Sequence, residues 1–375
     1  MLIILAAFGG AAHAQWQILN SGTTADLRGI DNVGGGMAWA SGTNGTVLRT
    51  VDGGETWQPC AIPPGAEHLD FRGIQAFDAN TAIVMSSGKG DLSRLYKTTD
   101  GCHTWKLVFT NPDKDGFWDA IKFFDRKTGV IIGDPVKGRL YSRMSSDGGE
   151  TWSPFYDDHG MDVGSLKVGF FAASNSALVL RVGNPYIIEA VANEDGSALD
   201  CFAAFGTTCD SRKPPNPSSC PSGWTWDAPT FLPIPSNGVS SGAFSRAWDE
   251  NKGWGIKAEV VVGGDYLKPD GRGGTAAYTT DSGKTWQAAR TPPHGYRSAV
   301  VYDAASKTWI TVGPNGTDIS TDDGKNWRAL HPDPAMHETP DADRNWNALS
   351  LPFVVGPHGR IGKLNPHALA PRSDP

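Results

Sequence analysis

The sequence predicts an all-β fold, a seven-bladed β-propeller built from four-stranded antiparallel blades. The first observation is an eight-residue box, [Ser/Thr]-x-Asp-x-Gly-x-Thr-Trp, which is complete in residues 50–57, 145–152 and 279–286 and partial in 98–105, 219–226 and 320–327. The second is its spacing: from Trp16 through the tryptophan that ends each box, the intervals are 41, 48, 47, 74, 60 and 41 residues. Each interval suits one blade, and Trp16 marks the remnant of a seventh repeat.

The chemistry of the box explains its recurrence. An aspartate early in a tight turn accepts hydrogen bonds from the backbone N–H groups that follow it, a glycine adopts positive φ, and the threonine and tryptophan begin the next strand. Truncating a buried tryptophan costs about 3 to 5 kcal/mol, against about 1 kcal/mol for one hydrogen bond. We therefore expect structural roles for Asp52, Trp57, Asp100, Trp105, Asp147, Trp152, Asp281, Trp286, Asp322 and Trp327.

The segments between boxes follow one order. A short apolar strand (27–30, 71–74, 117–121) precedes a second strand ending in glycine (37–42, 81–88, 129–133), and a third strand runs into the box. After Trp327 there are three strand-like runs, 346–349, 351–356 and 360–364, but no eighth box. The N-terminal strand near Trp16 is thus expected to complete the last blade, which closes the ring and removes open sheet edges.

The 74-residue interval is long enough to hold an insertion. Residues from about 193 to 219 are rich in Gly, Pro, Ser and Cys, which favours a loop. Three of the five cysteines, Cys201, Cys209 and Cys220, fall close together there and predict a disulfide among them, although the sequence does not determine the pairing. The odd number leaves at least one cysteine unpaired or intermolecular. Neither Cys-x-x-Cys nor a Cys/His zinc spacing occurs, and no metal or cofactor is expected.

The first 14 residues predict a signal peptide. They are apolar and rich in small residues, and Ala12-His13-Ala14 has the form of a signal-peptidase site. The alternative is a buried first strand. We expect residues 15–375 to form a single propeller domain that is exported to the periplasm or secreted. The remaining sequence has no apolar run of the ~18 residues that a membrane span needs, and the net charge of −7 argues against nucleic-acid binding. A monomer is expected.

The repeats resemble those of the Asp-box (BNR repeat, sialidase-like) β-propellers. The runs Leu27-Arg28-Gly29-Ile30, Ala38-Trp39-Ala40-Ser41-Gly42 and Gly45-Thr46-Val47-Leu48-Arg49-Thr50 are similar to the photosystem II stability and assembly factor branch. This resemblance implies an exported, non-catalytic binding or assembly scaffold that holds a protein partner, a membrane-protein assembly intermediate. Because one propeller fold carries many activities, it identifies neither the partner nor the ligand.

Repeat positions around the central channel predict a binding mouth. The second residue of the first strand and the residue after the glycine that ends the second strand should open on one face. The candidates are Arg28, Arg72, Asp119, Asp134, Asp265 and Arg297. Converging guanidinium groups favour a small anion or carboxylate. The alternative is that pairs such as Arg72 with Asp119 neutralise each other.

A carbohydrate-active hydrolase or a lectin is the alternative function for this mouth. Glycoside hydrolysis needs two closely spaced carboxyl groups, and Asp134 with Asp265 are the candidates, although they lie two blades apart. Sialidases of this fold place an arginine before Ile-Pro, whereas Phe71-Arg72-Gly73-Ile74 lacks the proline. The common hydrolase and phosphate-loop motifs do not occur. No catalytic residue is assigned.

Overall fold

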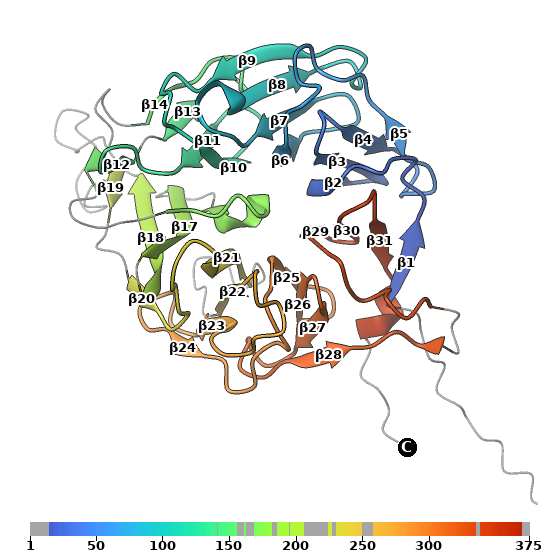
Figure 1. Ribbon diagram of the computed structural model, residues 1–375, viewed down its shortest axis with the longest axis vertical. Coiled ribbons are helices and arrows are strands. Elements are labelled where there is room, and N and C mark those ends of the chain that lie inside the picture. Colours follow the sequence, from blue (N-terminus) through green and yellow to red (C-terminus); the bar gives the residue numbers. More distant parts are fainter. Residues whose placement is uncertain are drawn as a thin grey trace, which may run out of the picture.

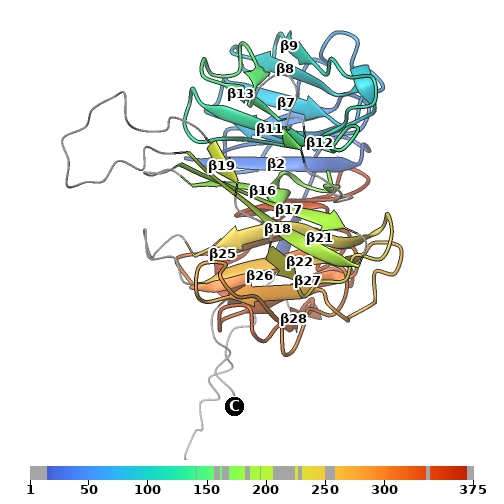
Figure 2. The ribbon, with the colours of Figure 1, turned by 90° about the vertical axis from the view of Figure 1, so that its left-hand side faces the viewer.

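The computed structural model describes residues 15–140, 142–155, 161–162, 169–181, 186–194, 196–205, 224–226, 230–249, 258–334 and 338–369. Its strands form seven antiparallel blades around a central axis (Figure 1), which confirms the predicted fold class. In the side view, β2 runs from one face of the disc to the other (Figure 2). No helix within these residues has the length and apolar character needed to cross a membrane.

The first three blades follow the chain in order. Blade 1 contains β2 (Leu27–Gly34), β3 (Met37–Gly42), β4 (Val47–Thr50) and β5 (Gln58–Pro59). Blade 2 contains β6 (Phe71–Ala76), β7 (Ala82–Ser86), β8 (Arg94–Thr98) and β9 (Lys106–Thr110), with the 3₁₀ turn η1 (Gly90–Leu92) between its middle strands. Blade 3 contains β10 (Trp118–Phe123), β11 (Gly129–Gly133), β13 (Arg143–Ser145) and β14 (Ser153–Pro154), and a separate pair joins β12 (Arg139–Leu140) to β15 (Met161–Asp162).

The next three blades keep the same strand order. Blade 4 begins with the 3₁₀ turn η2 (Asn175–Ala177) and contains β16 (Leu178–Arg181), β17 (Tyr186–Glu194), β18 (Ser197–Phe205) and β19 (Trp224–Trp226), while β20 (Thr230–Leu232) also pairs with β18. Blade 5 contains β21 (Ser241–Trp248), β22 (Glu259–Asp265), β23 (Ala276–Thr279) and β24 (Gln287–Ala288). Blade 6 contains β25 (Ala299–Asp303), β26 (Thr308–Gly313), β27 (Gly316–Ser320) and β28 (Arg328–Leu330).

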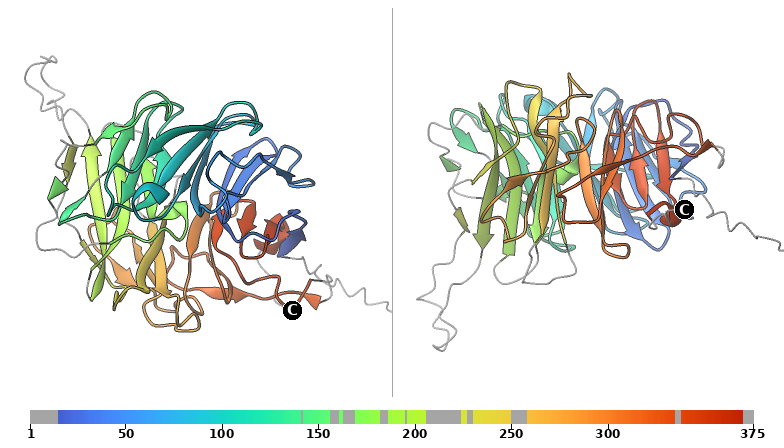
Figure 3. Two further views of the ribbon diagram at one scale, coloured as in Figure 1. Left: turned by 45° about the horizontal axis from the view of Figure 1, so that its top comes forward. Right: turned by 90° about the horizontal axis from the view of Figure 1, so that it is seen from below.

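Blade 7 joins the two ends of the domain, as the sequence predicts. Its strands are β29 (Ala348–Ser350), β30 (Phe353–Val355), β31 (Ile361–Leu364) and the N-terminal β1 (Trp16–Leu19), and η5 (Pro366–Leu369) follows. Trp16 pairs with Leu364 and Leu19 with Ile361, and the blue and red strands lie side by side in Figure 3. The buried Trp16 ring packs against Trp346, with centroids 5.9 Å apart. The N-terminal strand thus supplies the fourth strand of blade 7 and joins the two ends of the ring.

The first part of the predicted insertion is a strand and not a loop. Residues 197–205, expected in a loop, form β18 and pair with β17 along its whole length. Gly196 takes a φ of +104°, which allows a tight turn between the two strands, and Ala198 and Leu199 are fully buried. Burial of this apolar face therefore outweighs the loop-like composition. The rest of the segment, residues 206–223, lies outside the described residues.

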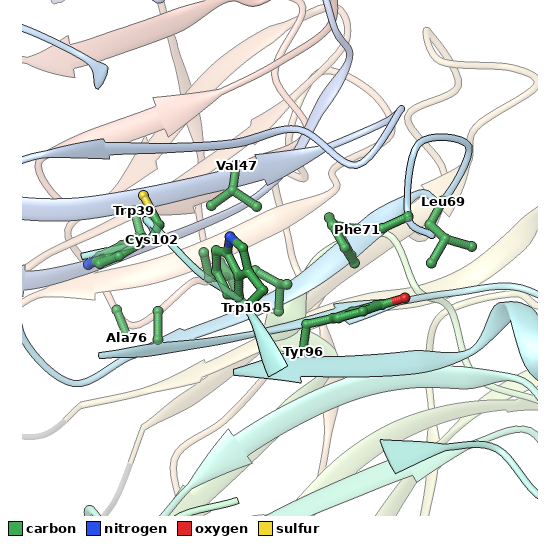
Figure 4. Close-up of a cluster of buried hydrophobic side chains, with 12 residues drawn as sticks. Trp39, Val47, Leu69, Phe71, Ala76, Tyr96, Cys102 and Trp105 are labelled. Carbon is green, nitrogen blue, oxygen red and sulfur yellow. The ribbon is translucent and has the colours of Figure 1, made fainter. Parts of the chain in front are cut away.

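Adjacent blades are held together by apolar clusters that include the box tryptophans. Between blades 1 and 2, Trp39 and Val47 pack with Phe71, Tyr96 and the box residue Trp105 (Figure 4). All five side chains are buried. Trp57 and Trp152 belong to corresponding clusters, whereas Trp286 is half-buried. The box tryptophan is thus placed for packing between sheets, where truncation costs most.

The box aspartates close their turns with side-chain hydrogen bonds. Asp147 accepts bonds from the Thr151 N–H (3.0 Å), the Thr151 hydroxyl (2.5 Å) and the Ser145 hydroxyl (2.9 Å). These bonds, the one from the Thr151 hydroxyl above all, lower the pKa of Asp147 to about 2. Equivalent threonine bonds lower the pKa values of Asp52, Asp100 and Asp281 to about 2. Burial raises the pKa of Asp322, but hydrogen bonds led by that from Asn326 lower it overall.

The box glycine faces the preceding blade. Gly149 has a φ of +84°, and a Cβ atom there would lie 2.3 Å from Ile83 Cδ1 of blade 2. In blade 2 the same position is Cys102, with a φ of +66°, and its thiol forms a disulfide with Cys60, which follows β5 of blade 1. Their Cα atoms are 5.3 Å apart. The box geometry therefore gives blades 1 and 2 a covalent link.

Sequence analysis missed this disulfide. The available signal was a cysteine at the box glycine of one blade and another three residues after the box tryptophan of the preceding blade. The predicted bridge among Cys201, Cys209 and Cys220 remains a prediction. Cys209 and Cys220 lie outside the described residues, and the structure does not describe the side chain of Cys201.

Candidate functional site

The centre of the ring holds a polar plug from blade 4. The segment η2 reaches toward the axis (Figure 1). The Asn175 amide donates to the Ile74 carbonyl (3.0 Å) and the Ile121 carbonyl (2.6 Å), and its oxygen accepts the Ile121 N–H (3.0 Å). The Ser176 and Ser245 hydroxyl groups lie 2.7 Å apart and share a hydrogen bond. The plug thus ties the inner strands of blades 2, 3 and 5 together and fills part of the channel that the sequence suggests to be open.

Arg28 and Arg72 lie together on the face where the innermost strands begin, and they share one carboxylate. Arg72 Nε donates to Asp70 Oδ2 (2.8 Å), and Arg28 Nε is 3.6 Å from Asp70 Oδ1. The two arginine side chains are 32% and 31% exposed. Arg28 Nη2 is also 3.9 Å from Asp26. Within the described residues, the Arg28 guanidinium makes these ion-pair contacts but no hydrogen bond. Its Nε is buried, so the terminal Nη groups are the donors that can meet a ligand.

Arg297 does not join them, and the prediction of three converging arginines is wrong. Its side chain is fully buried and donates from Nε to Asp318 Oδ2 (2.8 Å) and from Nη1 to Asn315 Oδ1 (2.6 Å) and the Tyr296 carbonyl (2.7 Å). Nη2 contacts Asp318 and the His294 ring. The buried Asp318 of β27 draws the guanidinium into blade 6, because a buried carboxylate is stable only when paired.

The pairing of Arg72 with Asp119 is also not found. Asp119 is buried, and neither carboxylate oxygen accepts a hydrogen bond of ordinary geometry from the described residues. Burial raises the pKa of Asp119 well above its usual value, and the charge of Asp134 raises it further, while Arg72 opposes the shift. Arg72 is instead engaged with Asp70. Asp119 therefore favours its neutral form in the folded protein.

The two carboxylates proposed for hydrolysis have separate structural partners. Asp134 accepts the Phe170 N–H (2.8 Å), and burial raises its pKa. It also lines a cavity of about 240 Å³ near Trp118. Asp265 accepts the Leu267 N–H (3.0 Å) and lies 3.8 Å from Lys268 Nζ. The described contacts therefore do not join Asp134 and Asp265 in one catalytic pair. Among the residues that the structure describes, no group of three or more His, Cys, Asp or Glu side chains is arranged to hold a metal ion.

An aromatic cluster that sequence analysis missed lies near the arginines. It comprises Phe171, Phe244, Tyr266 and Tyr296, and we call it the aromatic shelf. Phe171 and Phe244 stack with centroids 3.9 Å apart, and Tyr296 meets Phe244 edge-on at 4.8 Å. The only sequence signal was an aromatic residue directly after the mouth position Asp265. Because the four rings come from blades 4, 5 and 6, their assembly depends on the packing of these three blades.

Comparison with known proteins supports a family resemblance. Residues 9–175 match a family model described as photosynthesis system II assembly factor YCF48. The photosystem II assembly lipoprotein Ycf48 of Picosynechococcus is 32% identical over a match that covers 31% of this chain and 44% of that protein. The match thus spans less than half the length of this curated relative.

Two solved structures share the fold. A structure of YCF48 bound to D1 peptide has a TM-score of 0.59 and 15% identity, covering 94% of this chain and 98% of that one. YCF48 from Cyanidioschyzon merolae has a TM-score of 0.59 and 18% identity, covering 94% and 100%. At these identities the two structures support the fold alone. Together, the repeats, the observed blades and the family-model match identify the chain as a seven-bladed Asp-box β-propeller that resembles the photosystem II assembly factors of the Ycf48 type.

Proposed function

We propose that this protein is a non-catalytic assembly scaffold that binds a segment of a membrane-protein assembly intermediate. The support comes from the family-model match over residues 9–175 and from the relative named as a photosystem II assembly lipoprotein. A protein of the same fold has been solved with D1 peptide bound. We also propose that the protein acts after export, in the periplasm or outside the cell, in keeping with the predicted signal peptide.

The observation that carries the proposal is the pair of half-exposed arginines around Asp70. A guanidinium group binds a carboxylate with two parallel hydrogen bonds, and such charge-assisted bonds are stronger than neutral ones. The Nη groups of Arg28 donate to no described residue, whereas Arg72 already donates to Asp70 and to the Ala172 carbonyl. A carboxylate from a partner, either an acidic side chain or a chain terminus, fits these donors. The mouth is therefore proposed as the peptide-binding surface.

A pull-down from the native organism tests this function. The tagged parent should retain a membrane protein or its precursor, and the Arg28→Ala/Arg72→Ala variant should lose it. Arg126→Ala/Lys127→Ala is the matched control, because it removes two positive charges from the turn between β10 and β11 on the opposite face. Equal capture by the parent and the mouth variant would contradict the proposed surface.

Activity screening separates the scaffold from the hydrolase. The protein should not turn over fluorogenic sialosides or glucosides. If the parent hydrolyses such a substrate and Asp134→Asn or Asp265→Asn abolishes the hydrolysis, the proposal of a non-catalytic scaffold is wrong, since these are the carboxylates that a glycosidase of this fold would need at the mouth.

A further inference from the structure

We propose that the aromatic shelf is the apolar half of the binding mouth and that it holds a nonpolar side chain of a peptide whose carboxylate is bound by Arg28 and Arg72. This inference rests on the proposed function and specifies the chemistry of the partner segment. The recognised element is an extended peptide with an aliphatic or aromatic side chain close to a carboxylate.

The shelf has a buried layer beneath an exposed one. Phe244 and Tyr296 are buried, whereas Phe171 is half-buried and Tyr266 is 44% exposed. Tyr266 meets Phe171 and Phe244 nearly at right angles, with centroids 6.5 Å and 6.2 Å away. The buried rings fix the exposed ones in place. A ligand that packs on the shelf therefore meets a rigid surface and orders few protein side chains on binding.

Exposed aliphatic residues extend the shelf outward. Leu267 is 70% exposed and Val239 is 87% exposed. The Tyr266 N–H donates to the Ser240 carbonyl (3.1 Å), which ties the two loops together and brings these side chains to one part of the surface. Single exposed apolar residues are common, but a group of them beside ordered aromatic rings is typical of an interaction site.

The shelf is adjacent to the arginine pair. Arg72 Nη1 lies 3.4 Å from the carbonyl of Ala172, the residue after Phe171. Arg28 is also close to the shelf. Burial and, to a lesser extent, the nearby Tyr266 raise the pKa of Tyr296, while the positive charge of Arg28 opposes this shift. Arg28 therefore lies within electrostatic reach of Tyr296. A cationic edge thus borders an aromatic surface. A peptide can place a carboxylate on the first and a neighbouring side chain on the second.

The charge around the shelf favours such a peptide over a lipid surface. Residues 265–272 contain two aspartates and two basic residues, Asp265, Asp270, Lys268 and Arg272, and the whole chain carries a net charge of −7. Anionic membranes attract clusters of basic residues, whereas this segment has no net charge. The two arginines are placed at the mouth, where they suit a single carboxylate.

Labelled peptides test the shelf by fluorescence anisotropy. The probes are fluorescein-Gly-Ser-Gly-Leu-Ala with a free C-terminal carboxylate, the same peptide with serine for leucine, and the leucine peptide with a C-terminal amide. The parent should bind the leucine peptide with a dissociation constant roughly tenfold lower than that of the serine peptide, because the leucine side chain loses contact with water when it packs on an apolar surface. The amide should bind more weakly than the free carboxylate.

Two variants separate the halves of the mouth. Tyr266→Ser/Leu267→Ser should reduce the preference for leucine to less than about threefold while keeping the preference for the free carboxylate. Arg28→Ala/Arg72→Ala should reduce the preference for the free carboxylate over the amide while keeping the preference for leucine over serine. Val51→Ser/Leu107→Ser is the control, because it replaces two comparably exposed apolar side chains outside the mouth. Circular dichroism melts should be nearly equal for the parent, the shelf variant and the control.

The outcomes distinguish this inference from the proposed function. If leucine and serine peptides bind the parent equally, or if the shelf variant keeps the leucine preference, the shelf is not a peptide site, although the pull-down result can still stand. The absence of binding by every probe also overturns the inference. Sedimentation of the parent, but not of the shelf variant, with vesicles of phosphatidylcholine and phosphatidylglycerol would assign the shelf to a membrane instead.

Discussion

The Cys60–Cys102 disulfide gives a quantitative prediction about the link between blades 1 and 2. The variant Cys60→Ala/Cys102→Gly removes the disulfide and restores the glycine that the other described boxes carry at this position. For the sequence separation of 42 residues, the loop-closure relation assigns the bond about 4 kcal/mol of stability at ~298 K. Glycine at a φ of +66° removes left-handed strain of roughly 1 to 2 kcal/mol. The net loss in the free energy of unfolding should therefore be about 2 to 3 kcal/mol.

Urea denaturation followed by tryptophan fluorescence measures this loss. Under non-reducing conditions the variant should unfold at a lower urea concentration than the parent, and a reductant should bring the parent down toward the variant. The variant itself serves as the control for reduction elsewhere, because Cys201, Cys209 and Cys220 are present in both proteins. Unfolding free energies of parent and variant within about 0.5 kcal/mol of each other, without reductant, would refute the reasoning.

Three further predictions concern the box and the buried carboxyl group. Asp52, Asp100, Asp147 and Asp281 have a pKa of about 2, against 3.8 when unperturbed, so their stabilising effect is present above pH ~4 and is lost as the pH falls toward ~2. Asp147→Ala should flatten the dependence of melting temperature on pH in that range, and an unchanged slope would contradict this. Gly149→Ala should lower the free energy of unfolding by roughly 2 kcal/mol or more, because it places a side chain at a residue with positive φ, in contact with Ile83. In urea titrations, adding Ile83→Val should recover part of that loss. A Gly149→Ala variant that unfolds like the parent would rule out the close contact. Asp119→Asn should raise the melting temperature near pH ~7. The folded state of the parent favours the neutral acid, so the parent loses stability as the pH rises above ~4, and the gain should disappear near pH ~4. A lower melting temperature of the variant at neutral pH would show that the ionised carboxylate is needed.

The contacts that could be predicted from sequence are local or periodic. The hydrogen bonds of Asp147 fall within a single eight-residue box, so the motif itself identifies the turn. The regular return of the box tryptophans determines the number of blades. The three strands after Trp327, which lack a fourth, indicate that Trp16 belongs to the last blade. In each case the decisive groups are close in sequence or recur at a fixed interval.

The proposed mouth depended on contacts that no local pattern contains. Arg28, Arg72 and Arg297 occupy one repeat position, but Asp318 of β27, in the same blade as Arg297, draws Arg297 into the interior. Composition predicted a loop for residues 197–205, but burial against the neighbouring sheet made them a strand.

The sequence by itself determined the fold class, the blade count and the closure of the ring, because turn hydrogen bonds and alternating apolar residues act over short distances. Only the tertiary structure decided which repeat positions remain accessible and which thiols meet. It also brought Phe171, Tyr266 and Tyr296 together from three blades. These outcomes follow from packing between blades, where side chains far apart in sequence compete for the same space and the same charged partners.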